Sequence, residues 1–247
     1  MAIAEKIKIY MEKSSWIRKM FEEGARLKAQ HGADKVFDFS LGNPNLEPPK
    51  AVHQALSDLL QQSQPGLHAY MANAGYPETR KAVADYLSKE HQLPFSENDI
   101  VMTCGAAGAL NVILKALLNP GEELMILAPY FVEYLFYTEN FQGVPRVVST
   151  APDFSLDLKA IEQALNPKTK AILINSPNNP TGRVYDEKSL RQLGELLESY
   201  ARDKGQRVYL IGDEPYRKII YDQVQVPSLF QAYRSSIIVT SYSKDLS

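Results

Sequence analysis

The feature that most constrains the fold is a repeated change of hydrophobic pattern along residues 99–243. Short, continuous apolar runs alternate there with longer amphipathic segments. Continuous apolar runs are typical of strands that are buried on both faces of a sheet. The expected strands are 99–105, 123–129, 144–150, 170–177, 206–214 and 235–243, and the expected helices are 106–118, 130–141, 156–165 and 187–205. We therefore predict an α/β fold with a doubly wound, mostly parallel sheet.

The first hundred residues have a different pattern. Residues up to about 32 read as a helix, and a short strand over 36–42 follows. The Pro-rich stretch 43–50 predicts a turn. Two further helices are expected over 51–62 and 78–92, with an aromatic, Gly-containing loop between them.

Composition excludes several classes of protein. The 247 residues carry a net charge of −2 with acidic and basic groups interspersed, which gives no electrostatic footprint for nucleic acid or for an anionic membrane. No apolar run reaches the length of a membrane span, and the charged N-terminus does not resemble a signal peptide. Cys104 is the single cysteine, so neither an intrachain disulfide nor a thiolate metal cluster can form. We expect a soluble, cytoplasmic protein without a metal site.

Ligands of such sheets gather at the carboxyl ends of the strands. Small residues at 105–108, "GAAG", leave backbone N–H groups free at a helix N-terminus, which suits a phosphate, although a plain tight turn explains them equally well. Tyr130 or Phe131, after the next strand, could stack on a flat ring, whereas most aromatics on the helix that follows, such as Phe136, are expected in the core.

Three more strand ends carry polar residues. The string "NSPNNPTG" at 175–182 predicts a turn whose amide side chains point into a cleft. Asp213 follows a buried strand, where an unpaired carboxylate needs a cationic partner, although Asp213 or Glu214 could instead cap the next segment. Lys244 follows the last strand, and a lysine near a chain end is usually a solvated charge. Taken together, a phosphate site, a stacking aromatic, an aspartate and a lysine match the needs of pyridoxal phosphate, whose aldehyde forms a Schiff base with lysine.

The strings "NSPNNPTG", "DEPY" and "SYSK", in this order and spacing, resemble the class I/II aminotransferases of fold type I, and the similarity runs from "SLGNP" at 40–44 to the last residue. The resemblance implies that Lys244 forms the internal aldimine and then moves the substrate Cα proton. It also implies that Asp213 pairs with the pyridine nitrogen and that Tyr216 and Asn179 hydrogen-bond the phenolic oxygen of the cofactor. Phe131 matches the residue that stacks on the ring.

Further positions follow from the same resemblance. Ser241 and the N–H groups around Ala106 and Ala107, after Gly105, match the phosphate cup. Gly42 matches the backbone that meets the substrate carboxylate. Tyr70 is similar to a tyrosine that reaches the phosphate of the neighbouring subunit, which implies a homodimer with shared sites.

The resemblance also divides the chain and shows one departure. Residues 1–50 would be the N-terminal part of a smaller α+β domain, and 51–247 the large cofactor-binding domain, incomplete at its C-terminal end. Family members continue past the lysine with an arginine for the cofactor phosphate and another for the substrate α-carboxylate. They also place an antiparallel strand between the first strand of the sheet, here expected over 99–105, and the strand that precedes the lysine, so a chain that ended at Ser247 would leave 99–105 without its neighbour. We therefore expect the 247 residues to be part of a longer protein, with a truncated, inactive chain as the alternative.

The expected activity is transfer of an amino group from an L-amino acid, aspartate-like or aromatic, to a 2-oxo acid such as 2-oxoglutarate, with ping-pong kinetics. A carbon–sulfur lyase or a ring-forming synthase on the same scaffold would use the same cofactor-binding residues. A ligand-sensing domain of a transcription regulator is a weaker alternative, because no helix-turn-helix pattern precedes "SLGNP".

Overall fold

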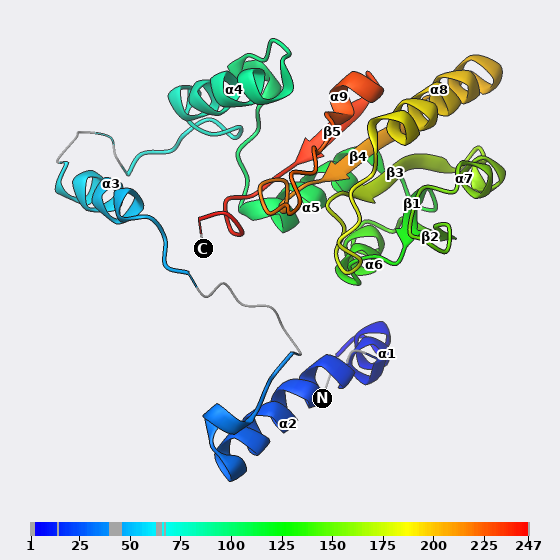
Figure 1. The fold of residues 1–247 in the computed structure, drawn as a ribbon. Coiled ribbons are helices and arrows are strands. Elements are labelled where there is room, and N and C mark those ends of the chain that lie inside the picture. Colours follow the sequence, from blue (N-terminus) through cyan, green and yellow to red (C-terminus); the bar gives the residue numbers. More distant parts are fainter. Residues whose placement is uncertain (1–2, 14, 40–45, 63–65, 67, 247) are drawn as a thin grey trace. The chain divides into compact units, whose positions relative to one another are not determined.

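The structure, a computed structural model, describes residues 3–13, 15–39, 46–62, 66 and 68–246. The chain divides into two compact units, Met1–Glu47 and Pro48–Ser247, and each is described by itself (Figure 1). Among the described residues, no helix combines the length and the apolarity that crossing a membrane requires.

The first unit is helical. It contains α1 (Glu5–Lys13), α2 (Ser15–His31) and a short 3₁₀ turn, η1 (Ala33–Lys35). Gly24 of α2 is buried where a Cβ would lie 3.0 Å from the Asp38 carboxylate, so the residues after the 3₁₀ turn pack closely on the helix. The single helix predicted to residue 32 is thus two helices. The strand predicted over 36–42 is wrong for 36–39, and 40–42 lie outside the described residues.

The second unit begins with α3 (Lys50–Gln61), α4 (Pro77–His91) and the 3₁₀ turn η2 (Glu97–Asp99). Its later helices are α5 (Gly105–Leu117), α6 (Glu133–Glu139), α7 (Leu158–Ala164), α8 (Glu187–Lys204) and α9 (Leu229–Ala232). Local signals explain their bounds. Asp157 and Asp186 cap α7 and α8 by accepting backbone N–H groups, and Gly205 ends α8 in the left-handed conformation.

Five parallel strands form one sheet in the order β2-β1-β3-β4-β5 (Figure 1). They are β1 (Glu123–Ala128), β2 (Val144–Ser149), β3 (Thr169–Asn175), β4 (Tyr209–Asp213) and β5 (Ser236–Val239). The order reverses between β1 and β3, because the chain moves outward to β2 and then returns to the other side of β1. This arrangement confirms the predicted α/β fold with a parallel sheet.

The predicted strand over 99–105 is wrong. Residues 97–99 form η2, Gly105 begins α5, and 100–103 join no strand within the described part of the chain. The Met102 N–H donates instead to the carbonyl of Ala74, at 2.9 Å. A strand requires a neighbour that pairs with its backbone groups, and the described edge strand β5 pairs only with β4.

Each face of the sheet has its own core, which explains why the strands are apolar throughout. Alternate strand residues such as Met125, Ile172 and Leu210 pack with α7, α8 and α9 on one face. Their neighbours, such as Ile126 and Leu173, pack with α5 and α6 on the other. Because side chains alternate along a strand, both sets are needed for a sheet that is covered on both faces. The carboxyl ends of the strands then remain free for a site.

Candidate functional site

The sequence-predicted site residues follow the carboxyl ends of four strands. Phe131 follows β1, Asn179 follows β3, Asp213 ends β4, and Ser241 and Lys244 follow β5. Parallel pairing brings these ends to one edge of the sheet, with Asn175 of β3 directly opposite Asp213 of β4. This edge borders the reversal of strand order between β1 and β3, where α/β sheets bind ligands.

Asp213 is the buried acid of this edge. Its residue is 6% exposed, and its Oδ2 accepts a hydrogen bond of 2.5 Å from the hydroxyl of Tyr134. Its Oδ1 is also buried but has no hydrogen-bond partner among the residues that the structure describes. Burial raises the pKa of Asp213 to about 6, against a lowering effect of the Tyr134 hydrogen bond. The free oxygen therefore faces a site that would favour a cationic or N–H group.

Tyr134 is a site residue that the sequence reading missed. It lies on α6, three residues after Phe131, and its ring packs edge-to-face against the Phe131 ring at 5.6 Å between centroids. Burial and the charge of Asp213 raise the pKa of Tyr134, so its hydroxyl stays protonated and remains a donor. The available signal was the i, i+3 spacing within the helix expected over 130–141, because that spacing puts both rings on one face of a helix. In the structure α6 begins at Glu133, so Phe131 lies just before it. Phe131 itself is 38% exposed, which leaves part of its ring open to a ligand.

Asn179 and Tyr216 lie on neighbouring loops. The Asn179 N–H donates to the Oδ1 of Asn175, at 2.6 Å, and the Asn175 amide donates to the carbonyl of Asp213, at 2.7 Å. Burial and the charge of Asp213 raise the pKa of Tyr216, and a hydrogen bond with the Asn179 side chain lowers it in part. Asn179, Tyr216 and Asp213 are thus brought together, as the sequence reading expected.

The loop that contains Asn179 is also held from within. Asn178, only 8% exposed, accepts hydrogen bonds from the N–H and the hydroxyl of Thr181 at 3.0 and 2.8 Å. Gly182 follows with φ +71, a conformation that other residues adopt at a cost. The order Asn-Asn-Pro-Thr-Gly therefore encodes a fixed turn, which aims Asn179 at Tyr216.

The N-terminus of α5 and Ser241 form the candidate phosphate cup. Gly105 opens the helix with φ +68, and the Ser241 hydroxyl lies 3.8 Å from the place where a Cβ on Gly105 would be. Ala106 is half-buried and Ala107 is exposed, so the small side chains leave the first N–H groups of the helix accessible. Ser241 also accepts the Ser243 N–H at 3.2 Å. The structure therefore joins two of the predicted loops at one helix N-terminus.

Lys244 lies in a turn after β5 and is exposed. Its Nζ is 5.9 Å from the centroid of the Tyr216 ring, which places the amine beside the loop that follows Asp213. The next residue, Asp245, forms an ion pair of 2.7 Å with Lys218. This pair fixes the turn that carries Lys244 to the segment after β4.

A second buried acid, Glu214, was considered only as a possible cap. It is 5% exposed and forms an ion pair of 2.8 Å with Arg217, whose guanidinium also contacts Glu90 of α4 at 3.3 Å. Arg217 further donates to the carbonyls of Val226 and Pro227 at 3.0 and 3.3 Å. Burial raises the pKa of Glu214 to about 7, while Arg217 lowers it in part. Glu214 therefore stabilises the fold through its ion pair with Arg217, whereas Asp213 has a buried oxygen without a hydrogen-bond partner among the described residues.

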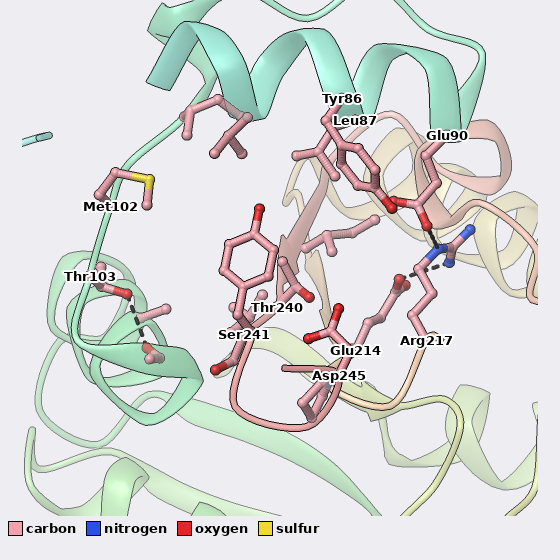
Figure 2. A pocket seen from close by; sticks show the side chains of 18 of the residues that line it. Tyr86, Leu87, Glu90, Met102, Thr103, Glu214, Arg217, Thr240, Ser241 and Asp245 are labelled. Atoms are coloured by element: carbon pink, nitrogen blue, oxygen red, sulfur yellow. Dashed lines mark hydrogen bonds and ion pairs between the residues drawn. The ribbon is translucent and has the colours of Figure 1, made fainter. Parts of the chain in front are cut away.

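A cavity of about 380 Å³ lies beside the phosphate cup, between α4, residues 99–103 and β5. Figure 2 shows Tyr86, Leu87 and Glu90 of α4 on one side of it and Thr240 and Ser241 after β5 on another. Gly105 and Ser241 belong to both the cavity and the cup. The cavity follows the edge of β5 that pairs with no described strand.

One predicted position, Tyr70, is not joined to this cluster. It lies on the loop before α4 and is fully exposed. Gly42 lies outside the described residues. No group of three or more His, Cys, Asp and Glu side chains that could hold a metal occurs in the part of the chain that the structure describes.

The residues at this edge of the sheet match the chemical groups of pyridoxal phosphate. The buried, unpaired Oδ1 of Asp213 suits the protonated ring nitrogen, the exposed part of Phe131 suits the ring face, and the α5 N-terminus with Ser241 suits the phosphate. The Lys244 amine, which lies beside the Tyr216 ring, suits the nucleophile that an aldehyde requires.

Comparisons with known proteins show the family of this chain. The family "Aminotransferase class I and II" matches residues 34–247. A probable aspartate aminotransferase of Methanocaldococcus jannaschii is 32% identical over 84% of this chain and 52% of its own length. A probable aspartate/prephenate aminotransferase of Thermus aquaticus is 38% identical over 77% of this chain and 48% of its own length.

Solved structures show the same relation. An aminotransferase from Eubacterium rectale superimposes with a TM-score of 0.92 at 35% identity, covering 100% of this chain and 63% of that one. An aspartate aminotransferase from Thermus thermophilus, solved with maleate, gives a TM-score of 0.79 at 30% identity over 93% of this chain and 58% of that one. The chain therefore spans about half the length of the curated relatives it matches.

Proposed function

The chain belongs to the class I and II aminotransferases, and we propose that it holds the cofactor and performs the proton transfers in the transfer of an amino group from an L-amino acid to a 2-oxo acid. The cofactor of this family is pyridoxal phosphate. The observation that carries the proposal is the buried Oδ1 of Asp213, which has no partner among the described residues although burial makes an unpaired carboxylate oxygen costly.

When bound, pyridoxal phosphate supplies an electron sink that makes the substrate Cα–H acidic. Asp213 holds a proton on the ring nitrogen, because a carboxylate in a buried site favours a neighbouring positive charge. Tyr134 supports this role by donating to the other oxygen of Asp213 and leaving Oδ1 free. Phe131 covers one face of the ring.

Lys244 is proposed as the group that anchors the cofactor and moves the Cα proton of the substrate. Its position near the Tyr216 ring supports this role. Asn179 and Tyr216 are proposed to hydrogen-bond the phenolic oxygen of the cofactor, and their mutual hydrogen bond keeps both side chains at one place. Ser241 and the N–H groups of residues 105–107 are proposed to bind the phosphate.

The substrates and the assembly extend the proposal. The names of relatives, aspartate and aspartate/prephenate aminotransferases, support an aspartate-like amino acid as donor. We propose 2-oxoglutarate as the acceptor and an aromatic amino acid as the alternative donor. We propose a homodimer in which Tyr70 reaches the cofactor phosphate of the second copy and Gly42 meets the substrate carboxylate. A single cysteine is in keeping with a cytoplasmic, reducing compartment.

Reduction with borohydride tests the anchor directly. The purified protein would be incubated with pyridoxal phosphate, reduced, and analysed by intact mass and peptide mapping. We expect one pyridoxyl group, on Lys244. An adduct on another lysine, or none, would contradict the proposal.

A coupled assay separates a transaminase from a lyase on the same scaffold. The protein would be supplied with an L-amino acid with and without 2-oxoglutarate. Product formation that requires the acceptor supports amino-group transfer. Release of ammonia and a 2-oxo acid without an acceptor would instead identify a lyase.

A further inference from the structure

We propose that Asn175 is a positioning residue that couples the loop carrying Asn179 to the end of the strand carrying Asp213. The inference rests on the proposed function, because both coupled residues are proposed to hold the cofactor. Asn175 itself is not expected to touch substrate or cofactor.

The geometry of Asn175 is that of a bridge. It is the last residue of β3, it is 4% exposed, and its register partner across the sheet is Asp213. Its Nδ2 donates to the Asp213 carbonyl at 2.7 Å, and its Oδ1 accepts from the Asn179 N–H at 2.6 Å. One side chain thus contacts the backbones of two site residues.

The orientation of the amide follows from its partners. A backbone carbonyl only accepts, so the atom facing the Asp213 carbonyl must be the nitrogen. A backbone N–H only donates, so the atom facing Asn179 must be the oxygen. Rotating the amide by half a turn would oppose like groups at both ends. The two contacts therefore fix a single orientation, and no hydrophobic side chain of similar size can replace it.

Asn175 lies at the point where the hydrogen bonds between β3 and β4 end and the loops after these strands begin. Backbone pairing between β3 and β4 ends at Asn175 and Asp213. The internal bonds of the next turn, between Asn178 and Thr181, stay within that turn and do not reach β4. Asn175 therefore supplies the connection that fixes the position of Asn179 relative to Asp213. Asp213 ends β4, immediately before Glu214.

This connection has a consequence for the cofactor oxygen. The Asn179 side chain hydrogen-bonds Tyr216, and both are proposed to contact the phenolic oxygen. If the loop were free to move, the hydrogen bond between Asn179 and Tyr216 would break. The site would then no longer favour an unprotonated phenolic oxygen on the cofactor. The expected signature is thus spectroscopic as well as structural.

The test compares Asn175→Ala and Asn175→Asp with the control Asn166→Ala. Asn175→Ala removes both contacts, whereas Asn175→Asp keeps the acceptor for Asn179 and opposes two oxygens at the Asp213 carbonyl. Asn166→Ala is a matched control because Asn166 also links the segment beside β3 to a neighbouring strand through its side-chain amide, which donates to Glu123 at 2.8 Å. This link lies at the amino ends of the strands, opposite the candidate site.

Three quantities would be measured on each variant: the dissociation constant for pyridoxal phosphate, the pH midpoint of the visible absorption of the bound cofactor, and the hydrogen-exchange rate of the Asn179 amide without cofactor. For both Asn175 variants we expect weakening of binding by about tenfold or more and an upward shift of the midpoint. The Asn179 amide should exchange at least about tenfold faster in Asn175→Ala. Asn166→Ala should change the dissociation constant and the exchange rate by no more than about twofold and should leave the pH midpoint where it is, even if it lowers thermal stability.

The outcomes separate this inference from the proposed function. Unchanged exchange at Asn179 in Asn175→Ala overturns the coupling, whatever the cofactor does. Faster exchange with unchanged binding and midpoint in both Asn175 variants overturns the positioning role. Faster exchange in a protein whose unaltered form binds no pyridoxal phosphate leaves the structural link intact but contradicts the proposed function and the role assigned within it.

Discussion

The middle of the sheet and its β5 side differ in how completely the site is built. At the ends of β3 and β4, Asn175, Asn179 and Asp213 are linked by short hydrogen bonds, and Asp213 is 6% exposed. On the β5 side, Lys244 is exposed and a cavity of about 380 Å³ runs along the strand edge. Both regions carry residues of the same proposed reaction, but they differ in burial and in the hydrogen bonds that hold them.

The difference indicates that the residues proposed to hold the cofactor ring are preorganised by burial, whereas the turn that carries Lys244 is held by local contacts. The local contacts are the Lys218–Asp245 ion pair and the hydrogen bonds around Ser241. Substitutions in the middle of the sheet should therefore change stability and chemistry together. Substitutions after β5 should change chemistry with little loss of stability.

The largest expected effect is on activity and comes from the exposed region. Lys244→Ala should abolish transamination, because neither the anchor nor the proton-transferring amine remains. Stability should stay within about 0.5 kcal/mol of the unaltered protein, as for other exposed positions. A coupled transaminase assay and urea unfolding measure the two quantities. Turnover in Lys244→Ala above that of the free cofactor would contradict the assignment.

In the buried region, Arg217→Met should give the largest loss of stability. It leaves Glu214, 5% exposed, without its cation, and breaking a buried ion pair typically costs about 3–5 kcal/mol. Because burial already raises the pKa of Glu214 to about 7, the loss should be smaller at pH 5, where the carboxyl can take a proton, than at pH 8. Urea unfolding at both pH values measures it.

Arg191→Met is the matched control for that substitution. Arg191 pairs with Glu187 at 2.6 Å on α8, but both side chains are more than half exposed. The expected loss is below about 0.5 kcal/mol and independent of pH. Equal losses in the two variants would show that burial of the Glu214 pair contributes nothing, and would remove the contrast between the two regions.

Asp213→Asn separates stability from function at one buried position. The folded pKa of Asp213 is raised from 3.8 to about 6, so the folded state without cofactor binds the proton more tightly than the unfolded state does. Stability is thus lost as pH rises from about 4 to about 7, and the loss reaches about 3 kcal/mol at pH 8. The Asn variant lacks this loss.

We therefore expect the cofactor-free Asp213→Asn variant to be more stable than the unaltered protein at pH 8 and to converge with it near pH 4. Its transaminase activity should fall by orders of magnitude, because an amide does not hold the ring-nitrogen proton by charge. Chemical unfolding from pH 4 to pH 8 checks the first part. A variant that is less stable at pH 8 would show that Asp213 is not an unpaired charge.

The sequence could predict the strands and the loops that carry Asp213, Asn179 and Lys244, because these depend on local pattern. Residues 99–105 were predicted as a strand from their apolar pattern alone, and that pattern does not show whether another strand pairs with them. The ion pair between Arg217 and Glu90 joins residues 127 positions apart, which no local spacing reveals.

Two polar partners were missed for a related reason. Tyr134 was read as one of the aromatics of a core-facing helix, and its hydroxyl partner lies 79 residues away at Asp213. Asn175 fell in both the strand expected over 170–177 and the turn expected over 175–182, and neither pattern showed that its side chain bonds both the Asn179 N–H and the Asp213 carbonyl. Residue type shows that a side chain can donate or accept, but only the folded chain shows to which group. The residues proposed to touch the cofactor could therefore be named from the sequence, whereas the partners that position them could not.

Tyr134→Phe should have the smallest effect and tests how far the buried region depends on a single hydrogen bond. The hydroxyl that donates to Oδ2 is lost while the ring that packs against Phe131 remains. The pKa of Asp213 should rise further above about 6, because the hydrogen bond lowers it. Stability near pH 8 should fall by about 1 kcal/mol, and less near pH 5, where Asp213 can be protonated.

Tyr200→Phe on α8 is the control, because Tyr200 packs against the core on the other face of the sheet. Urea unfolding at pH 5 and pH 8 measures both variants, and titration with pyridoxal phosphate follows binding. A fall in affinity for Tyr134→Phe alone would show that the hydroxyl keeps Asp213 charged for the ring nitrogen. An equal response of the two variants would mean that Asp213 is held by burial and backbone pairing alone, and that the preorganisation of the buried region does not extend to this hydroxyl.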